Sequence, residues 1–182
     1  MRVIAGERGG LPLKSLKGSG TRPTSDKVKE SIFNIIGPYF NGGRVVELFG
    51  GSGALSIEAL SRGADDAIIF EKNRAATKVI HDNVQKCRYE SKVTVHVKDA
   101  RHAIQILQKE QQKIHFLFVD PPYADTHFYQ LIEQMIEADL LAEDAIIVCE
   151  HDKKIQLPSQ YGPFPVRKSN VYGNIAITIY EK

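Results

Sequence analysis

The sequence predicts a single α/β domain with a mostly parallel sheet that is covered by helices on both faces. From residue 44 onward, short apolar runs alternate with amphipathic helical patterns, which is typical of the βα units that build parallel sheets. Several runs are continuously apolar, as in FLFV and AIIVC, so both of their faces should be buried. A length of 182 residues fits one domain.

The first 40 residues precede this alternation and predict an amino-terminal extension to a core that covers residues 41–182. Residues 2–5 and 11–14 alternate around two glycines and predict a small β-hairpin. Residues 15–23 are rich in Gly, Ser and Lys and predict a loop. Thr24 or Ser25 can then cap a helix that runs to about residue 40.

The core elements follow from the same periodicities. The apolar runs predict strands at residues 44–48, 67–71, 93–98, 114–120 and 145–150. Helical spacing predicts helices at residues 54–62, 74–87, 101–109 and 128–138. The tail at residues 167–180 is broken by Tyr172-Gly173-Asn174, which predicts a hairpin that adds antiparallel strands at the sheet edge.

Charge is unevenly distributed along the chain. The first 31 residues hold seven basic and three acidic residues, although the whole chain has a net charge of only +2. A basic arm on a slightly acidic body is typical of a surface that contacts phosphates. A solvated, flexible arm explains the same charge equally well. The candidate phosphate-contacting residues of this arm are Arg2, Arg8, Lys14, Lys17 and Arg22.

The sequence argues against disulfide-stabilised, metal-binding and membrane-spanning proteins. Cys87 and Cys149 lie far apart and outside any CxxC spacing, and the six histidines form no HExxH pair, so we expect no disulfide framework and no metal site. No apolar run approaches the roughly 18 residues that a membrane helix needs. We therefore expect a cytoplasmic protein without a membrane partner.

A glycine-rich loop, Glu47-Leu-Phe-Gly-Gly-Ser-Gly-Ala54, connects the first core strand to the first core helix. In an open α/β sheet this turn lies at the carboxyl edge, where ligands bind, and glycines let the backbone approach a ligand closely. An NAD-type fingerprint needs a third glycine where this chain has Ser56. A dinucleotide site is weakened by this difference but not excluded.

Acidic residues end the next two strands. Glu71 lies 18 positions beyond Gly53 and can accept hydrogen bonds from both hydroxyls of a ribose. Asp99 ends the third strand, where it could approach an adenine amino group. Each alone is more simply explained as a helix cap. Together with the glycine loop, they favour a nucleoside pocket.

The most specific motif is Asp120-Pro121-Pro122-Tyr123, directly after a buried strand. Two prolines end the strand and fix the backbone. The Asp120 carboxylate and the Pro121 carbonyl could accept the two N–H bonds of a base amine and stabilise the charge that develops as it is methylated. Tyr123 could stack on the base. A Pro-rich turn with a structural aromatic is the alternative.

With these motifs in place, the chain resembles the bacterial 16S rRNA guanine-N2 methyltransferases of the RsmD type over essentially its whole length. The amino-terminal segments discriminate best, because many methyltransferases share only the glycine loop and the proline motif. The matching segments are RVIAGERGGLPL, RPTSDKVKESIFN, ELFGGSGALSIEALSRGA, FVDPPY and the final VYGN. Where the family's commonest pattern is FAGSG, this chain has Gly50 in place of the alanine, a mild change.

The resemblance implies a class I (Rossmann-like) methyltransferase fold with a seven-stranded mixed sheet and S-adenosylmethionine as the methyl donor. It implies a guanine of 16S rRNA as the target, within an assembling small ribosomal subunit, and we expect a monomer. For the base it implies Asp120, Pro121 and Tyr123 as catalytic residues, with Pro122 beside the RNA. The implied donor site comprises Thr24, Glu47, Phe49, Gly51, Gly53, Glu71 and Asp99.

Three alternatives remain open. The proline motif also serves methylation of adenine N6 in DNA or RNA, and only the amino-terminal resemblance favours guanine. A non-catalytic RNA-binding or ribosome-assembly factor could keep the fold, but it would have no reason to keep the glycine loop, Glu71, Asp99 and Asp120 together. An NAD-dependent oxidoreductase shares the fold but lacks the third glycine.

Overall fold

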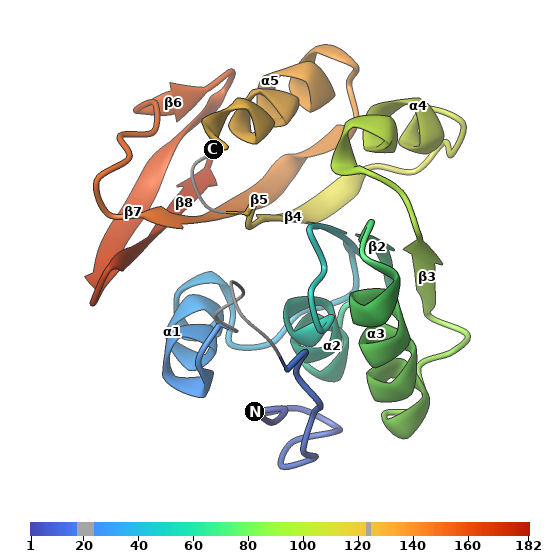
Figure 1. The fold of residues 1–182 in the computed structure, drawn as a ribbon. Coiled ribbons are helices and arrows are strands. Elements are labelled where there is room, and N and C mark those ends of the chain that lie inside the picture. Colours follow the sequence, from blue (N-terminus) through green and yellow to red (C-terminus); the bar gives the residue numbers. More distant parts are fainter. Residues whose placement is uncertain (18–23, 123–124) are drawn as a thin grey trace.

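A single mixed sheet organises the molecule (Figure 1). The computed structural model describes residues 1–17, 24–122 and 125–182. The strand order is β3-β2-β1-β4-β5-β8-β7-β6, with parallel pairing from β3 to β5 and antiparallel pairing from β5 to β6. The strands are β1 (Arg44–Leu48), β2 (Asp66–Phe70), β3 (Val93–His96), β4 (Ile114–Val119), β5 (Leu141–Asp152), β6 (Gln160–Tyr161), β7 (Phe164–Tyr172) and β8 (Ile175–Glu181).

Helices cover both faces of the sheet (Figure 1). Helices α1, α2 and α3 lie on one face, and α4 and α5 lie on the other. Two short 3-10 turns, η1 and η2, lead into α4 and α5. The bounds are α1 (Asp26–Ile36), α2 (Ala54–Ser61), α3 (Arg74–Lys86), η1 (Ala100–His102), α4 (Ala103–Leu107), η2 (Thr126–Tyr129) and α5 (Gln130–Glu137).

The apolar strands supply two separate cores, as their continuous hydrophobicity predicts. Successive side chains of a strand point to opposite faces, so Ile69 packs in the core beneath α1, α2 and α3 whereas Phe70 packs in the core beneath α4 and α5. In β4, Phe118 and Val119 divide between the same two cores. The predicted α/β sheet with both faces covered is confirmed.

The sheet differs from expectation at its antiparallel end. Within the described residues it has eight strands rather than seven, because Tyr161 and Phe164 pair in a two-residue ladder that adds β6 beyond β7. Strand β5 also begins at Leu141, four residues before the predicted start, with a register shift opposite β4 between Ile114 and Phe116. Strand β8 comes last in sequence among the described strands, yet it lies between β5 and β7.

Helix α1 begins where the sequence predicts but ends earlier. The Ser25 side chain accepts a hydrogen bond from the Val28 N–H and caps the helix. The helix ends at Ile36 rather than near residue 40, with Gly37 as its C-cap. Pro38 follows immediately and has no N–H with which to extend the helical ladder.

The amino-terminal segment, residues 1–17, docks on α2 rather than standing alone. The predicted hairpin is present in a short form: Arg2 and Pro12 form an antiparallel bridge. Backbone hydrogen bonds from the Val3 N–H to the Leu11 carbonyl and from the Leu13 N–H to the Met1 carbonyl flank it. The buried Glu58 carboxylate of α2 accepts hydrogen bonds from the Ile4 and Ala5 N–H groups at 2.8 and 3.1 Å. Lys29 of α1 is buried beside it, with 3.5 Å between the Lys29 ammonium nitrogen and a Glu58 oxygen. These contacts fix the segment against the helical layer.

Candidate active site

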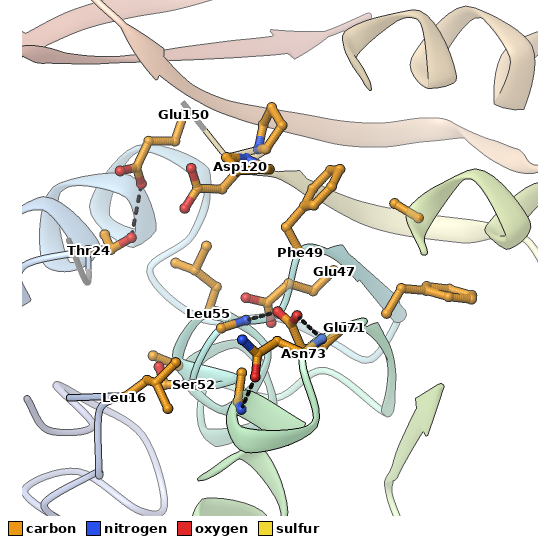
Figure 2. Close-up of a pocket in the computed structure, with 18 of the residues that line it drawn as sticks. Leu16, Thr24, Glu47, Phe49, Ser52, Leu55, Glu71, Asn73, Asp120 and Glu150 are labelled. Atoms are coloured by element: carbon orange, nitrogen blue, oxygen red, sulfur yellow. Dashed lines mark hydrogen bonds between the residues drawn. The ribbon is translucent and has the colours of Figure 1, made fainter. Parts of the chain in front are cut away.

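A cavity of about 280 Å³ lies at the carboxyl edge of the parallel strands (Figure 2). Its walls come from the glycine loop after β1 and from the ends of β2, β4 and β5. The amino-terminal segment closes one side through Met1, Ser15 and Leu16. Ligands of open α/β sheets bind at this edge, so the cavity is the candidate site.

The glycine loop is shaped by close packing on one side and by open space on the other. A Cβ on Gly50 would lie 2.3 Å from a methyl carbon of Ile69, so this position leaves no room for a side chain unless Ile69 moves. Gly51 lines the cavity with a φ of +56°, and a Cβ there would meet nothing within 4 Å. Gly53 has a φ of +76° and is the N-cap of α2, outside the cavity lining.

Phe49, which precedes these glycines, lines the cavity and packs edge-on against Phe128 at 4.7 Å between ring centroids. Its φ of +66° is rare for a residue with a side chain. The loop therefore holds an aromatic side chain at the cavity wall in a conformation that only its surroundings can impose.

Glu47 is buried at the base of the cavity and supports the loop. Its carboxylate accepts hydrogen bonds from the N–H and the hydroxyl of Ser56 in the first turn of α2. Burial raises the pKa of Glu47 to about 7, although the bonds from Ser56 favour the charged form. Ser56, which stands where an NAD fingerprint has its third glycine, thus binds the Glu47 carboxylate.

Glu71 projects into the cavity from the end of β2 (Figure 2). Its carboxylate accepts hydrogen bonds from the Gly51 N–H at 2.9 Å and from the Asn73 N–H at 2.8 Å. These bonds orient it against the glycine loop. Asn73 in turn caps α3 by accepting from the Ala75 and Ala76 N–H groups.

Asp99 is engaged outside the cavity lining. Its carboxylate accepts from the Arg101 N–H at 3.0 Å, which caps η1, and also binds the Arg101 guanidinium. The hydrogen bonds from the Arg101 side chain hold the pKa of Asp99 near 2. The capping role that the sequence left open is therefore present, and Lys98 and Ala100 line the cavity in its place.

Asp120, Pro121 and Pro122 all line the cavity directly after β4. The Asp120 side chain points into the cavity (Figure 2). Its pKa is raised well above the usual range by burial and by the nearby carboxylates of Glu150 and Glu47. Tyr123, the aromatic of the motif, lies outside the described residues.

Glu150 is the main site residue that sequence reasoning missed. It lies near the end of β5, lines the cavity and is only 9% exposed. Its carboxylate accepts a hydrogen bond from the Thr24 hydroxyl at 2.9 Å, which also brings Thr24 to the cavity. The predicted strand at 145–150 ended on this residue, so the same rule that selected Asp120 could have found it.

The cations of the amino-terminal arm are partly engaged within the protein. The Arg8 guanidinium donates to the Cys87 carbonyl at 2.7 Å and lies 5.2 Å from the Tyr89 ring centroid. Arg2 and Lys14 are mostly exposed but face Asp26 and Asp82. Lys17 is exposed, and Arg22 lies outside the described residues.

The described parts of the chain show neither a metal-binding cluster nor a membrane-spanning helix. Within residues 1–17, 24–122 and 125–182, no three His, Cys, Asp or Glu side chains gather closely enough to hold a metal ion. In the same ranges, no helix has the length and apolar character needed to cross a membrane.

This strand order, with a glycine loop after β1 and a ligand cavity at the carboxyl edge, defines a class I methyltransferase fold. The chain belongs to the family described as Conserved hypothetical protein 95, whose model matches residues 1–181.

The chain is similar to named proteins and solved structures over most or all of its length. It is 41% identical to the YlbH protein of Bacillus subtilis over 100% of this chain and 99% of that protein. It is 29% identical to Ribosomal RNA small subunit methyltransferase D of Escherichia coli K12, over 100% of this chain and 90% of that protein. The Escherichia coli yhhF structure superposes with a TM-score of 0.84 at 28% identity, covering 100% of this chain and 97% of that one. A conserved hypothetical protein of Streptococcus pyogenes superposes with a TM-score of 0.80 at 41% identity, covering 85% and 95%.

Proposed function

We propose that this protein is an S-adenosylmethionine-dependent methyltransferase that methylates the exocyclic N2 amine of a guanine in 16S rRNA. The observation that carries the proposal is the placement of Asp120. Its carboxylate, fixed by two following prolines, points into an acidic cavity beside the glycine loop. The family supports the reaction, because the Escherichia coli and Haemophilus influenzae relatives are named ribosomal RNA small subunit methyltransferases.

The cavity suits a donor that carries positive charge. Six acidic residues line it against two lysines, Lys72 and Lys98, and a cationic ligand offsets the repulsion among the carboxylates. The acidic residues are Glu47, Glu71, Asp120, Asp125, Glu150 and Asp152. When bound, S-adenosylmethionine supplies an electrophilic methyl group on a sulfonium. The apolar side chains that line the same space, including Leu16, Leu55 and Phe70, suit the uncharged parts of such a molecule.

Each proposed donor-site residue has a distinct role. Glu71, already oriented by Gly51, accepts hydrogen bonds from the ribose hydroxyls. Phe49 forms the cavity wall, and Gly53 sets the turn into α2. Glu47 supports the site by accepting a hydrogen bond from the first turn of α2. Asp99 supports it by capping η1.

On the substrate side, Asp120 positions the amine. Its carboxylate and the Pro121 carbonyl accept the two N–H bonds of guanine N2, which orients the amine and leaves its lone pair available for the methyl group that a bound donor would supply. The raised pKa of Asp120 suits it to receive the proton that the amine loses after methylation. Pro122 borders the base, and Tyr123 stacks on it.

A base within a duplex cannot reach this recessed edge, so the target must be unpaired or extruded. Arg2, Arg8, Lys14, Lys17 and Arg22 are proposed to hold the RNA backbone, with Arg8 limited by its bond to the Cys87 carbonyl. RNA shape on an assembling small subunit would supply the sequence specificity. We place the protein in the cytoplasm as a monomer.

Methylation assays on free DNA, free 16S rRNA and assembling small subunits, followed by mass spectrometry of the nucleosides, test the proposal. The expected product is N2-methylguanosine, from rRNA or particles and not from DNA. Formation of N6-methyladenosine instead would establish the adenine alternative. RNA binding without turnover on any substrate would establish a non-catalytic assembly factor.

A further inference from the structure

Glu150 and Asp120 form a carboxylate pair on neighbouring strands. In the parallel register of β4 and β5, Val119 is the partner of Cys149, so the next residues along, Asp120 and Glu150, come side by side. Neighbouring strands lie roughly 4.8 Å apart. Both side chains line the cavity, and Figure 2 shows them together above Thr24.

The position of Glu150 is fixed on both its backbone and its side chain. The Tyr129 hydroxyl donates to the Glu150 carbonyl at 2.6 Å, and the Thr24 hydroxyl donates to one oxygen of its carboxylate. Next along β5, His151 is held by the Thr178 hydroxyl at 2.8 Å. Fixed in this way, Glu150 acts as a preformed acceptor rather than a mobile acidic side chain.

A second buried acceptor beside Asp120 requires a ligand that brings additional donors. Burial raises the pKa of both carboxyl groups, so each needs a hydrogen-bond donor to stay ionised in a filled site. Thr24 supplies one donor to Glu150. Guanine presents three N–H bonds along one edge, two on N2 and one on N1, and both nitrogens are bonded to C2. Adenine presents two N–H bonds on N6, and its N1 is an acceptor.

We propose that Glu150 is a specificity-determining residue whose carboxylate accepts the N1–H of the target guanine while Asp120 holds the N2 amine. This inference rests on the proposed function and names the group that distinguishes guanine from adenine. A base with an unprotonated N1 would place a lone pair against the Glu150 carboxylate and give no donor to the oxygen that Thr24 does not bind. Such a mismatch rejects the wrong base as well as favouring the right one.

The test compares two bases that carry the same nucleophile. The rRNA or particle substrate is assembled with either guanine or 2-aminopurine at the methylated position. Both bases have the N2 amine, but N1 of 2-aminopurine is an acceptor. The wild type is expected to prefer guanine by about 100-fold or more in kcat/KM, since a site built to accept an N–H leaves its carboxylate unpaired without one.

The Glu150→Gln variant keeps the shape of the side chain and its acceptor for Thr24 but adds an N–H donor. Its preference for guanine is expected to shrink to less than about 10-fold or to reverse, with guanine turnover lowered and donor binding by calorimetry retained. Glu143→Gln, at an exposed ion pair with Lys182, is the matched control and should keep the wild-type preference.

Two outcomes would overturn this inference while leaving the proposed function intact. One is equal turnover of both bases by the wild type, a measurement that needs no variant to fold. The other is a Glu150→Gln enzyme that is slower on both bases by the same factor, which is the pattern of a purely structural role. If the wild type produced N6-methyladenosine, the proposed function would fail first and this inference with it.

Discussion

At the scale of single residues, the site depends on carboxylates that the fold holds in an unfavourable environment. Glu47, Asp120 and Glu150 are all clustered at one cavity, and burial raises the pKa of each. An ion pair away from the site shows the opposite shift, because the contact with Lys182 lowers the pKa of Glu143. Perturbed acids in a cavity are typical of functional sites.

Replacing Asp120 separates chemistry from donor binding. Asp120→Ala should lower kcat by on the order of 10³-fold, because an electrostatic contact to the reacting amine is lost. Donor affinity measured by calorimetry should stay within about tenfold of wild type, since other residues hold the donor. Unchanged turnover in this variant would remove Asp120 from the mechanism.

Glu47 predicts a pH-dependent stability. Its pKa rises from 4.5 to about 7 on folding, so the folded state retains a proton that the unfolded chain releases. Its contribution to stability is therefore lost as pH rises from about 4.5 to about 7. Glu47→Gln keeps an acceptor for Ser56 without the charge and should gain stability relative to wild type over this range, by on the order of 3 kcal/mol. Urea unfolding of both proteins at pH 5 and pH 8 measures it, and a difference independent of pH would contradict it.

Sequence reasoning located most of these residues because they follow recognisable strands. Glu71 and Asp120 were found from their places at strand ends, and both line the cavity. Glu150 occupies an equivalent place in β5, but no neighbouring motif drew attention to it. The pairing of Thr24 with Glu150 joins residues 126 positions apart, and no local pattern could predict it.

At the scale of elements, periodicity predicted the core helices and the longer core strands, but it missed the two-residue strand β6 and misplaced the ends of several elements. The start of β5 was missed because Glu143 and Asp144 interrupt the apolar run and are exposed in the strand. Helix α1 was predicted too long because Phe40 is apolar at helical spacing, although it packs from a loop onto Phe116. In β5 the pairing with β4 overrode the local pattern, whereas in α1 the apolar spacing outweighed a local stop signal, the Pro38 that follows the Gly37 C-cap.

The docking of the amino-terminal segment on α2 can be tested with two glycines. Gly6 and Gly10 have nearly equal φ values of +86° and +89°, so an alanine at either adds similar backbone strain. A Cβ at Gly6, however, would lie 1.8 Å from the Ser61 carbonyl oxygen, whereas one at Gly10 would meet nothing within 4 Å.

Gly6→Ala is therefore expected to detach the segment and destabilise the protein by clearly more than Gly10→Ala, which should cost about 1 kcal/mol. Donor affinity should fall only in Gly6→Ala, because Met1, Ser15 and Leu16 form part of the cavity wall. Thermal unfolding and calorimetry measure the two effects. Equal behaviour of both variants would mean that the contact with Ser61 is unimportant.

At the scale of the whole molecule, charge is distributed less simply than the sequence implies. The arm carries seven cations in its first 31 residues, but the Lys29 side chain is buried against Glu58, and the Arg8 guanidinium binds a main-chain carbonyl. Burial and pairing are tertiary properties, so counting residues overestimated the surface available to phosphates.

The double variant Lys14→Ala and Lys17→Ala should weaken RNA binding and reduce the slope of log affinity against log salt by about one for each lysine that contacts a phosphate. The matched control is Lys113→Ala with Lys182→Ala, since both of these residues line a separate hollow away from the candidate site. Binding titrations at several salt concentrations measure the slopes, and equal slopes in the two double variants would argue against the arm as the RNA surface.

The central position of β8 has a consequence for how the protein is made. Strand β5, which carries Glu150, pairs with β4 on one side and with β8 on the other. Strand β8 is synthesised after β6 and β7. Until β8 is made, one edge of β5 has no pairing strand. Strand β7 cannot join the sheet either, because β8 is the strand that connects it to β5. The sheet around the Asp120 and Glu150 carboxylates is therefore finished only after β8 has left the ribosome and inserted between β5 and β7.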